Sequence, residues 1–246
     1  MLRHLCAADV GPADVGPSET WGVLYVASLC WLLCLSRWWL LPESRCVPCV
    51  AMLDTNLSIL CWNVRGLNCP DRRAAVHETV ASSSCQLVCI QESKLQSIDL
   101  FLAMYLGGQR LKSFAQRPAD GTKGGILLLW DDSAVTVSNV QIGAYFLSAT
   151  VAINNYGDDK SFKLTTVYGP TRSIHKEAFY LELISEKPPP GTKWLVNGDF
   201  NQIYRARDKN RANVDRGRLV RFRNALNNCE LKEIHMQNRR FTWSNE

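Results

Sequence analysis

The chain has 246 residues, of which 46% are hydrophobic and 21% charged, so it is long and apolar enough to form a sizeable globular core. Its ten Cys include several within apolar runs and lack the arrangement of a secreted disulfide framework, which excludes that class. Residues 1–56 carry a net charge of −2, whereas residues 57–246, with 25 basic and 18 acidic residues, carry +7. This basic part favours a polyanionic partner.

The first 56 residues are interpreted as a leader that is separate from the rest of the chain. Within them, residues 21–41 read WGVLYVASLCWLLCLSRWWLL, which is close to the ~20 apolar residues needed to cross a bilayer. The acids Asp9, Asp14 and Glu19 precede this run where a signal peptide would have positive charge. Two interpretations stay open: a single membrane anchor, or an accidental leader.

From Leu57 onward, short apolar runs alternate with amphipathic helical patterns and turn clusters. Strands are expected at residues 57–64, 86–92, 124–130, 135–143, 145–153, 162–170, 193–200 and 239–243. Helices are expected at residues 72–82, 96–106, 174–186 and 217–228. Two of these strands, at 135–143 and 145–153, alternate polar and apolar residues as antiparallel neighbours do. This mixture predicts an α+β layered sandwich and not a simple doubly wound sheet.

Polar side chains follow four of the expected strands at the same end. The first strand gives Asn63, the second Glu92 and a middle strand Tyr168, and a late strand gives Asp199 and Asn201. Asp and Asn are disfavoured inside strands and common in turns, so each residue taken alone could simply mark a turn. Together they indicate that the side chains converge at one edge of a sheet. A carboxylate suits Mg²⁺, and amide and phenol groups can hold phosphate oxygens.

Five motifs occur in order along this part of the chain: CWNVRGL, CIQES, VYGP, NGDFN and RRFTWSNE. This ordered set resembles the endonuclease/exonuclease/phosphatase superfamily over residues 57–246. More narrowly, it is similar to the apurinic/apyrimidinic-endonuclease-like domain of plant non-LTR (LINE-type) retrotransposons. The resemblance implies a four-layer α/β/β/α sandwich, of the DNase-I-like type, with two mixed sheets packed face to face.

The resemblance also implies roles for the five residues. Glu92 would ligate Mg²⁺ (or Mn²⁺), and Asn63 would help to hold the metal-bound phosphate. Asp199 would lie by the leaving group or polarise the attacking water, Asn201 would orient that water or the phosphate, and Tyr168 would donate to a phosphate oxygen. The implied reaction is metal-assisted hydrolysis of a phosphodiester.

Two departures from the family pattern qualify this expectation. The family's Ser-Asp-His segment, whose His acts as general base, occurs nowhere in the sequence, and Arg65 stands where some branches have a metal-contacting acid. We therefore expect a domain that is truncated and incomplete at its C-terminus, with weak or no activity alone. The alternatives are a non-catalytic nucleic-acid-binding retrotransposon remnant and a phosphoesterase of the same superfamily.

A basic stretch follows the NGDFN motif. It is interpreted as a contact for the DNA backbone, although most charge runs are simply solvated faces. DNA is thus the expected partner, with a membrane as a second one if residues 21–41 are an anchor; the location would be nuclear or membrane-bound accordingly. The expected DNA-contacting residues are Arg205, Arg207, Lys209, Arg211, Arg216, Arg218, Arg221 and Arg223.

Overall fold

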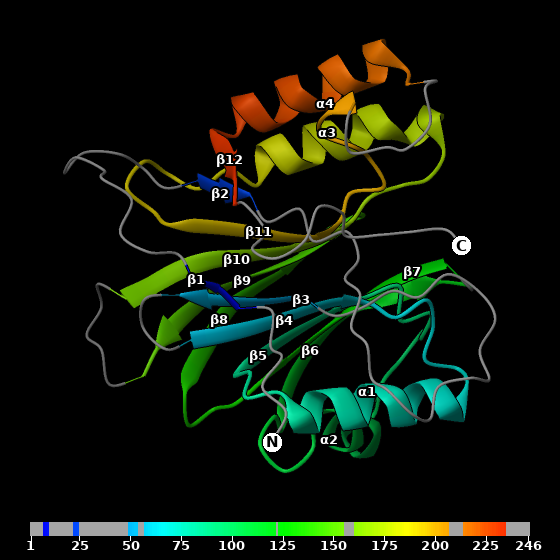
Figure 1. Ribbon diagram of the computed structural model, residues 1–246, viewed down its shortest axis with the longest axis vertical. Helices are drawn as coiled ribbons and strands as arrows, with labels where there is room; N and C mark the ends of the chain where they lie inside the picture. Colours follow the sequence, from blue (N-terminus) through cyan, green and yellow to red (C-terminus); the bar gives the residue numbers. More distant parts are fainter. Residues whose placement is uncertain are drawn as a thin grey trace.

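The computed structural model describes residues 57–121, 123–154, 160–206 and 214–234, together with the backbone of three short strands, β1 (Ala7–Asp9), β2 (Gly22–Leu24) and β3 (Cys49–Leu53). Two mixed β-sheets pack face to face, and helices cover the outer face of each (Figure 1). The predicted α+β, four-layer, DNase-I-like sandwich is therefore confirmed.

The first sheet, sheet A, has the strand order β1-β3-β4-β5-β7-β6, and the second, sheet B, the order β12-β2-β11-β10-β9-β8. Both combine parallel and antiparallel pairs. The strands of sheet A after β3 are β4 (Leu57–Asn63), β5 (Leu87–Gln91), β6 (Ser113–Asp120) and β7 (Lys123–Trp130). Those of sheet B after β2 are β8 (Val135–Ile142), β9 (Phe146–Ile153), β10 (Ser161–Tyr168), β11 (Trp194–Asp199) and β12 (Leu231–Glu233).

The central strands are buried on both faces, which explains their nearly continuous apolar sequences. In β5, Leu87 and Cys89 face the core between the sheets, whereas Val88 and Ile90 face the helices outside sheet A. Successive side chains of a strand point to opposite faces, so one run of apolar residues serves two cores.

Two helices lie on the outer side of each sheet (Figure 1). The helices α1 (Pro70–Ser82) and α2 (Leu100–Gly107) close the core outside sheet A. Outside sheet B lie α3 (Lys176–Ser185), which follows the short 3₁₀ turn η2 (Ser173–His175), and α4 (Arg216–Asn228). Aromatic side chains fill this second outer core: the ring of Phe222 lies 5.5 Å from that of Phe200.

Several elements differ from the sequence prediction, among them the short strand β12, which was not predicted. The helix α2 begins at Leu100 and not at residue 96, because the Asp99 carboxylate accepts the Leu102 N–H at 2.7 Å and so caps the helix there. The strand β6 was not predicted. It is polar and contains Pro118, which an edge strand tolerates because its missing N–H is not needed by a neighbour.

The described strands before Leu57 extend the sheets upstream of the expected domain start. All five residues of β3 pair antiparallel with β4, and β2 lies between β11 and β12. Apart from β2, the apolar segment 21–41 falls outside the described residues, as does the last expected strand, 239–243. Among the helices of the described ranges, none is long and apolar enough to cross a membrane.

The Cys85 thiol gives the fold a measurable pH dependence. It is 1% exposed, and burial raises its pKa to about 11 from 9.0, although a hydrogen bond with Ser83 and the charge of Arg110 oppose the rise. The unfolded thiol thus ionises at lower pH than the folded one. The stability that Cys85 contributes is present below pH 9 and is lost as the pH rises toward 11.

We expect the unfolding free energy of the wild type to fall by roughly 2–3 kcal/mol more than that of Cys85→Ala between these pH values. Urea unfolding under reducing conditions measures the difference. Replacing the exposed Cys69 by Ala is the control and should leave the pH dependence of the wild type unchanged. Equal slopes for wild type and Cys85→Ala would contradict the assignment.

Candidate active site

The five polar residues that end strands in the sequence lie together in the structure. Two parallel pairs carry them: β4 with β5 in sheet A, and β10 with β11 in sheet B, where Tyr168 is the register partner of Asp199. Parallel strands present their carboxyl ends at one edge, and the facing sheets bring both edges together. The Asn63 Nδ2 atom donates to Asp199 Oδ2 at 2.9 Å, across the two sheets and 136 residues of sequence.

Asp199 is the most enclosed acid of the site, with 9% of its surface exposed. Its second oxygen, Oδ1, accepts the Asn201 N–H at 2.8 Å. Burial raises the pKa of Asp199; the hydrogen bonds from Asn201 and Asn63 oppose this rise, the nearby Glu92 carboxylate adds to it, and Lys176 opposes it. The carboxylate is therefore held in a fixed orientation in a poorly solvated place.

Asn63 serves the turn and the site at once. Its Oδ1 accepts the Arg65 N–H at 3.1 Å, and Arg65 adopts a left-handed backbone with φ of +54°. Side-chain acceptance from the backbone two residues on is the usual way in which Asn shapes a turn. The turn interpretation and the site interpretation of this residue are thus compatible.

Glu92 and Tyr168 meet from opposite sheets. The Tyr168 side chain lies near the Glu92 carboxylate, and the pKa of its phenol is raised, chiefly by burial and then by the charges of Glu92 and Asp199. The phenol therefore stays protonated at neutral pH and can act as a hydrogen-bond donor. Glu92 has a φ of +56°, and its Oε1 lies 3.1 Å from the Lys94 Nζ.

Asn201 completes the turn after β11. It has a φ of +48°, and its Nδ2 donates to the Gly169 carbonyl at 2.8 Å. A buried lysine that the sequence analysis did not identify, Lys176, donates from Nζ to the carbonyls of Phe200 and Asn201. In the sequence it is one polar residue among several in a helical pattern, so nothing distinguishes it from a surface lysine.

The donor set fits a hard divalent cation. The carboxylates of Glu92 and Asp199 are close enough for each to disfavour the other's charge, and a cation between them would relieve this repulsion. Within the described residues no group of three or more His, Cys, Asp or Glu could enclose a metal. Mg²⁺ does not need such a cage, because it commonly keeps several waters and takes one or two carboxylates.

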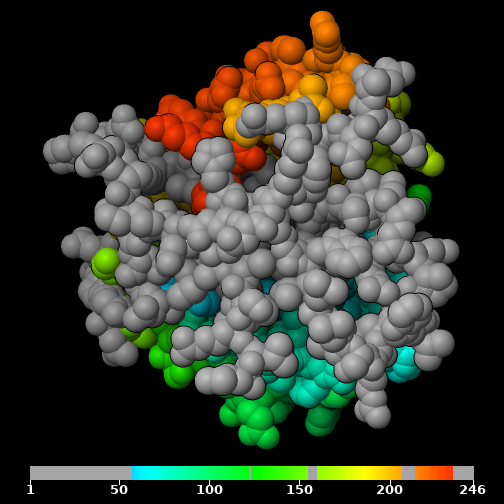
Figure 2. Space-filling view, viewed as in Figure 1, coloured from blue at the N-terminus to red at the C-terminus, as the bar shows by residue number. Residues whose placement is uncertain are grey.

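The described part of the basic stretch is divided between internal contacts and exposed surface. Arg205 pairs with Glu233 at 2.8 Å, and the Arg223 Nε donates to the Tyr204 carbonyl at 2.8 Å. Helix α4, orange to red in Figure 2, carries the exposed Arg216 and Arg221 and the half-buried Arg218. The three other predicted residues, Arg207, Lys209 and Arg211, lie outside the described ranges.

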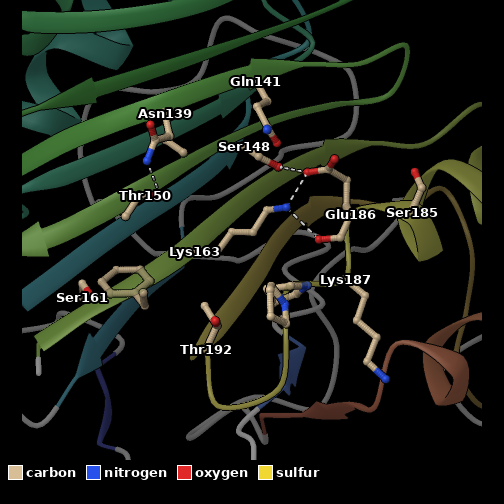
Figure 3. A pocket seen from close by; sticks show the side chains of 14 residues that line it. Asn139, Gln141, Ser148, Thr150, Ser161, Lys163, Ser185, Glu186, Lys187 and Thr192 are labelled. Atoms are coloured by element: carbon tan, nitrogen blue, oxygen red, sulfur yellow. Dashed lines mark hydrogen bonds and ion pairs between the residues drawn. The ribbon is translucent and has the colours of Figure 1, made fainter.

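A polar hollow of about 460 Å³ lies elsewhere, on the outer face of sheet B (Figure 3). Its walls include Lys163 near the start of β10 and Thr192 just before β11, so it is at the opposite end of these strands from Tyr168 and Asp199. A Lys163–Glu186 ion pair of 2.9 Å occupies one side. None of the five predicted site residues lines this hollow.

Comparison with known proteins gives one family and a set of similar folds. Residues 60–245 match the model described as "Endonuclease/Exonuclease/phosphatase family". Among solved structures, the AP endonuclease LMAP from Leishmania major aligns at 15% identity with a TM-score of 0.54, covering 70% of this chain and 66% of that one. The APE2 catalytic domain from Xenopus laevis aligns at 19% identity with a TM-score of 0.51, covering 69% and 66%. The chain thus spans 66% of the length of each, and no curated protein matches its sequence.

The approach of β11 to β10 beside Asp199 requires a glycine. Gly198 has a φ of +124°, and a Cβ there would lie 2.0 Å from the Val167 carbonyl oxygen. We expect Gly198→Ala to cost roughly 3 kcal/mol or more in unfolding free energy, from steric overlap added to backbone strain. Gly191→Ala is the matched control, because Gly191 also has a positive φ but an added Cβ would meet nothing within 4 Å. It should cost about 1 kcal/mol, and denaturant melts compare the two; equal losses would rule out the steric explanation.

Proposed function

We propose a function on one premise: this chain belongs to the endonuclease/exonuclease/phosphatase family. The function is hydrolysis of phosphodiester bonds in DNA with the help of a divalent cation. The observation that supports it best is the hydrogen bond between Asn63 and Asp199, which joins the strand ends of both sheets beside Glu92, Tyr168 and Asn201. The likeness in fold to an AP endonuclease and to the APE2 catalytic domain supports DNA as the first substrate to test.

In this proposal Glu92 ligates the cation, Mg²⁺ or Mn²⁺, and Asn63, in the same metal site, helps to hold the metal-bound phosphate. A bound cation would supply positive charge next to the phosphoryl oxygens. In the structure the Lys94 ammonium already places a positive charge next to the Glu92 carboxylate, with Nζ 3.1 Å from Oε1. Glu92 would exchange this partner, at least in part, for the cation.

The other three residues act on the phosphate and on water. Asp199 accepts hydrogen bonds at both oxygens from within the protein, which fixes the direction in which its charge can polarise a water or a leaving group. Tyr168, kept protonated by its surroundings, donates to a phosphate oxygen. Asn201, whose amide is tied to Gly169, orients water or phosphate. Preorganised groups of this kind act without rearranging during the reaction.

The exposed arginines of α4 extend this proposal to the DNA backbone. Arg216 and Arg221 lie on the same helix as Arg218, whose charge reaches Lys176 beside the site. Contacts of this type bind phosphates without reading sequence, and they weaken as salt rises.

The ordered motifs favour a more specific assignment, to the endonuclease type of non-LTR retrotransposons. That type uses a Ser-Asp-His segment, which the 246 residues do not contain. A positioned general base typically contributes ~10²–10⁴-fold, so this chain by itself is expected to be slow by about that factor. A nucleic-acid-binding role without turnover is the second candidate function, favoured by the exposed Arg216 and Arg221 of α4.

Metal binding is testable without turnover. We expect Glu92→Ala to weaken Mn²⁺ binding by about 10-fold or more, because a cation loses its carboxylate ligand. Calorimetric titration measures the affinity. Glu177→Ala, which removes an exposed acid from the first turn of α3, should change it little. An unchanged affinity in Glu92→Ala would show that Glu92 is not the ligand.

Plasmid nicking tests the proposed function. The full chain is expected to nick supercoiled DNA slowly with Mg²⁺ and not with EDTA, and Asp199→Ala is expected to lose at least about 100-fold of the rate. Binding of a short duplex, measured in parallel by fluorescence anisotropy, should weaken with salt and with Arg221→Ala.

The outcomes separate the two candidate functions. Nicking that needs both Mg²⁺ and Asp199 supports the nuclease. Folded protein that binds duplex but does not nick it supports the binding role, and folded protein that does neither removes both.

A further inference from the structure

Lys176 occupies an unusual position for a lysine. It is the first residue of α3 and is 4% exposed, although a cation in the first turn of a helix faces the positive end of the helix dipole. Removing an ammonium from water is also costly unless it is paired. Such a placement persists only where specific contacts compensate for both penalties.

The compensating contacts come from the last residue of β11 and from the turn that follows it. The Lys176 Nζ donates to the Asn201 carbonyl at 2.8 Å and to the Phe200 carbonyl at 3.1 Å, and the Asp199 carboxylate lies close enough to stabilise its charge. The opposing charge is Arg218 of α4. Burial outweighs the attraction and lowers the pKa of Lys176 to about 8.

These contacts reach the two residues that directly follow Asp199. Asn201 has a left-handed backbone, which is strained for a residue with a side chain. Its N–H must stay aimed at Asp199 Oδ1, 2.8 Å away, and the Gly169 N–H bonds to the Asp199 carbonyl at 2.7 Å. The hydrogen bonds from Lys176 to the carbonyls of Phe200 and Asn201 therefore help to hold the backbone next to Asp199 in place.

We propose that Lys176 is a positioning residue, which holds the turn of Phe200 and Asn201 so that Asp199 and Asn201 keep the arrangement needed for phosphodiester hydrolysis. The inference rests on the proposed function for its catalytic part only. Lys176 itself does not touch the substrate, since its ammonium is turned into the protein.

Hydrogen exchange measured by NMR on the full chain tests whether Lys176 holds the turn of Phe200 and Asn201. Because Lys176→Met removes both hydrogen bonds to the turn, the amides of Asn201 and Gly169 should exchange at least about 10-fold faster than in the wild type. The amides of the central strand β5 should keep their rates. A purely structural loss would instead accelerate all of these amides together.

The matched control is Lys163→Met. Lys163 is also largely buried and also donates to a backbone carbonyl, that of Glu186 at 2.7 Å, but it lies at the far end of β10. It should leave the Asn201 and Gly169 amides unchanged. Lys176→Gln keeps a shorter hydrogen-bond donor, so the Asn201 and Gly169 amides should exchange at rates between those of the wild type and Lys176→Met. This variant also provides a second test if Lys176→Met does not fold.

The catalytic part is tested by the nicking assay. Lys176→Met should lower kcat by about 10-fold or more while KM changes less than about twofold, because positioning acts on the reaction and not on DNA binding. Unchanged exchange at Asn201 in Lys176→Met and Lys176→Gln would overturn the proposal, as would the same change in Lys163→Met. If the wild type does not nick, the proposed function fails, and the exchange data still decide whether Lys176 holds the turn.

Discussion

The face-to-face packing of the two sheets is the constraint on which the site depends. Apolar side chains from both sheets, among them Cys89, Leu128, Leu164 and Leu195, fill the space between them. The central strands are buried on both faces and hold uncharged polar side chains such as Asn197, whereas the acids Glu92 and Asp199 lie where strands end. The hydrogen bond from Asn63 to Asp199 lies at that boundary, where the dry interior meets the exposed edge.

The charges at this edge are arranged in alternation. Glu92 has Lys94 beside it, and Asp199 has Lys176 behind it. Burial still raises the pKa of Asp199, and the charge of the nearby Glu92 carboxylate adds to this rise. The lysine charges thus offset part of the unfavourable electrostatics at Asp199, and clusters of such perturbed groups are typical of functional sites.

Much of this site could be predicted from the sequence because its residues interrupt apolar runs. Asn63 and Asp199 are conspicuous as the last residues of β4 and β11, because Asp and Asn are disfavoured in strands. The prediction of a layered α+β fold rested on the same apolar runs, which alternate with helical patterns. The strand β6 was missed because Pro118 and its polar neighbours do not look like a strand, and an edge position tolerates them.

Lys176 was missed for a different reason. A helical pattern shows which residues share a face, but it does not show which polar residue meets a carbonyl from another part of the chain. Its partners, Phe200 and Asn201, are separated from it by 24 and 25 residues. Contacts of this kind are set by the packing of α3 on sheet B, which the local sequence does not encode.

The sequence separation of the site residues also determines when chemistry becomes possible during folding. Sheet A can form from β4 through β7 once Trp130 has been made, which provides Asn63 and Glu92. Asp199 follows many residues later and must then cross to the other sheet to meet Asn63. Contacts of such long range close late, and domains of this topology fold slowly. A nascent or partly folded chain therefore holds the side of the edge with Glu92, the proposed cation ligand, without the buried acid Asp199. Completion of the second sheet is the step that would make the protein capable of reaction.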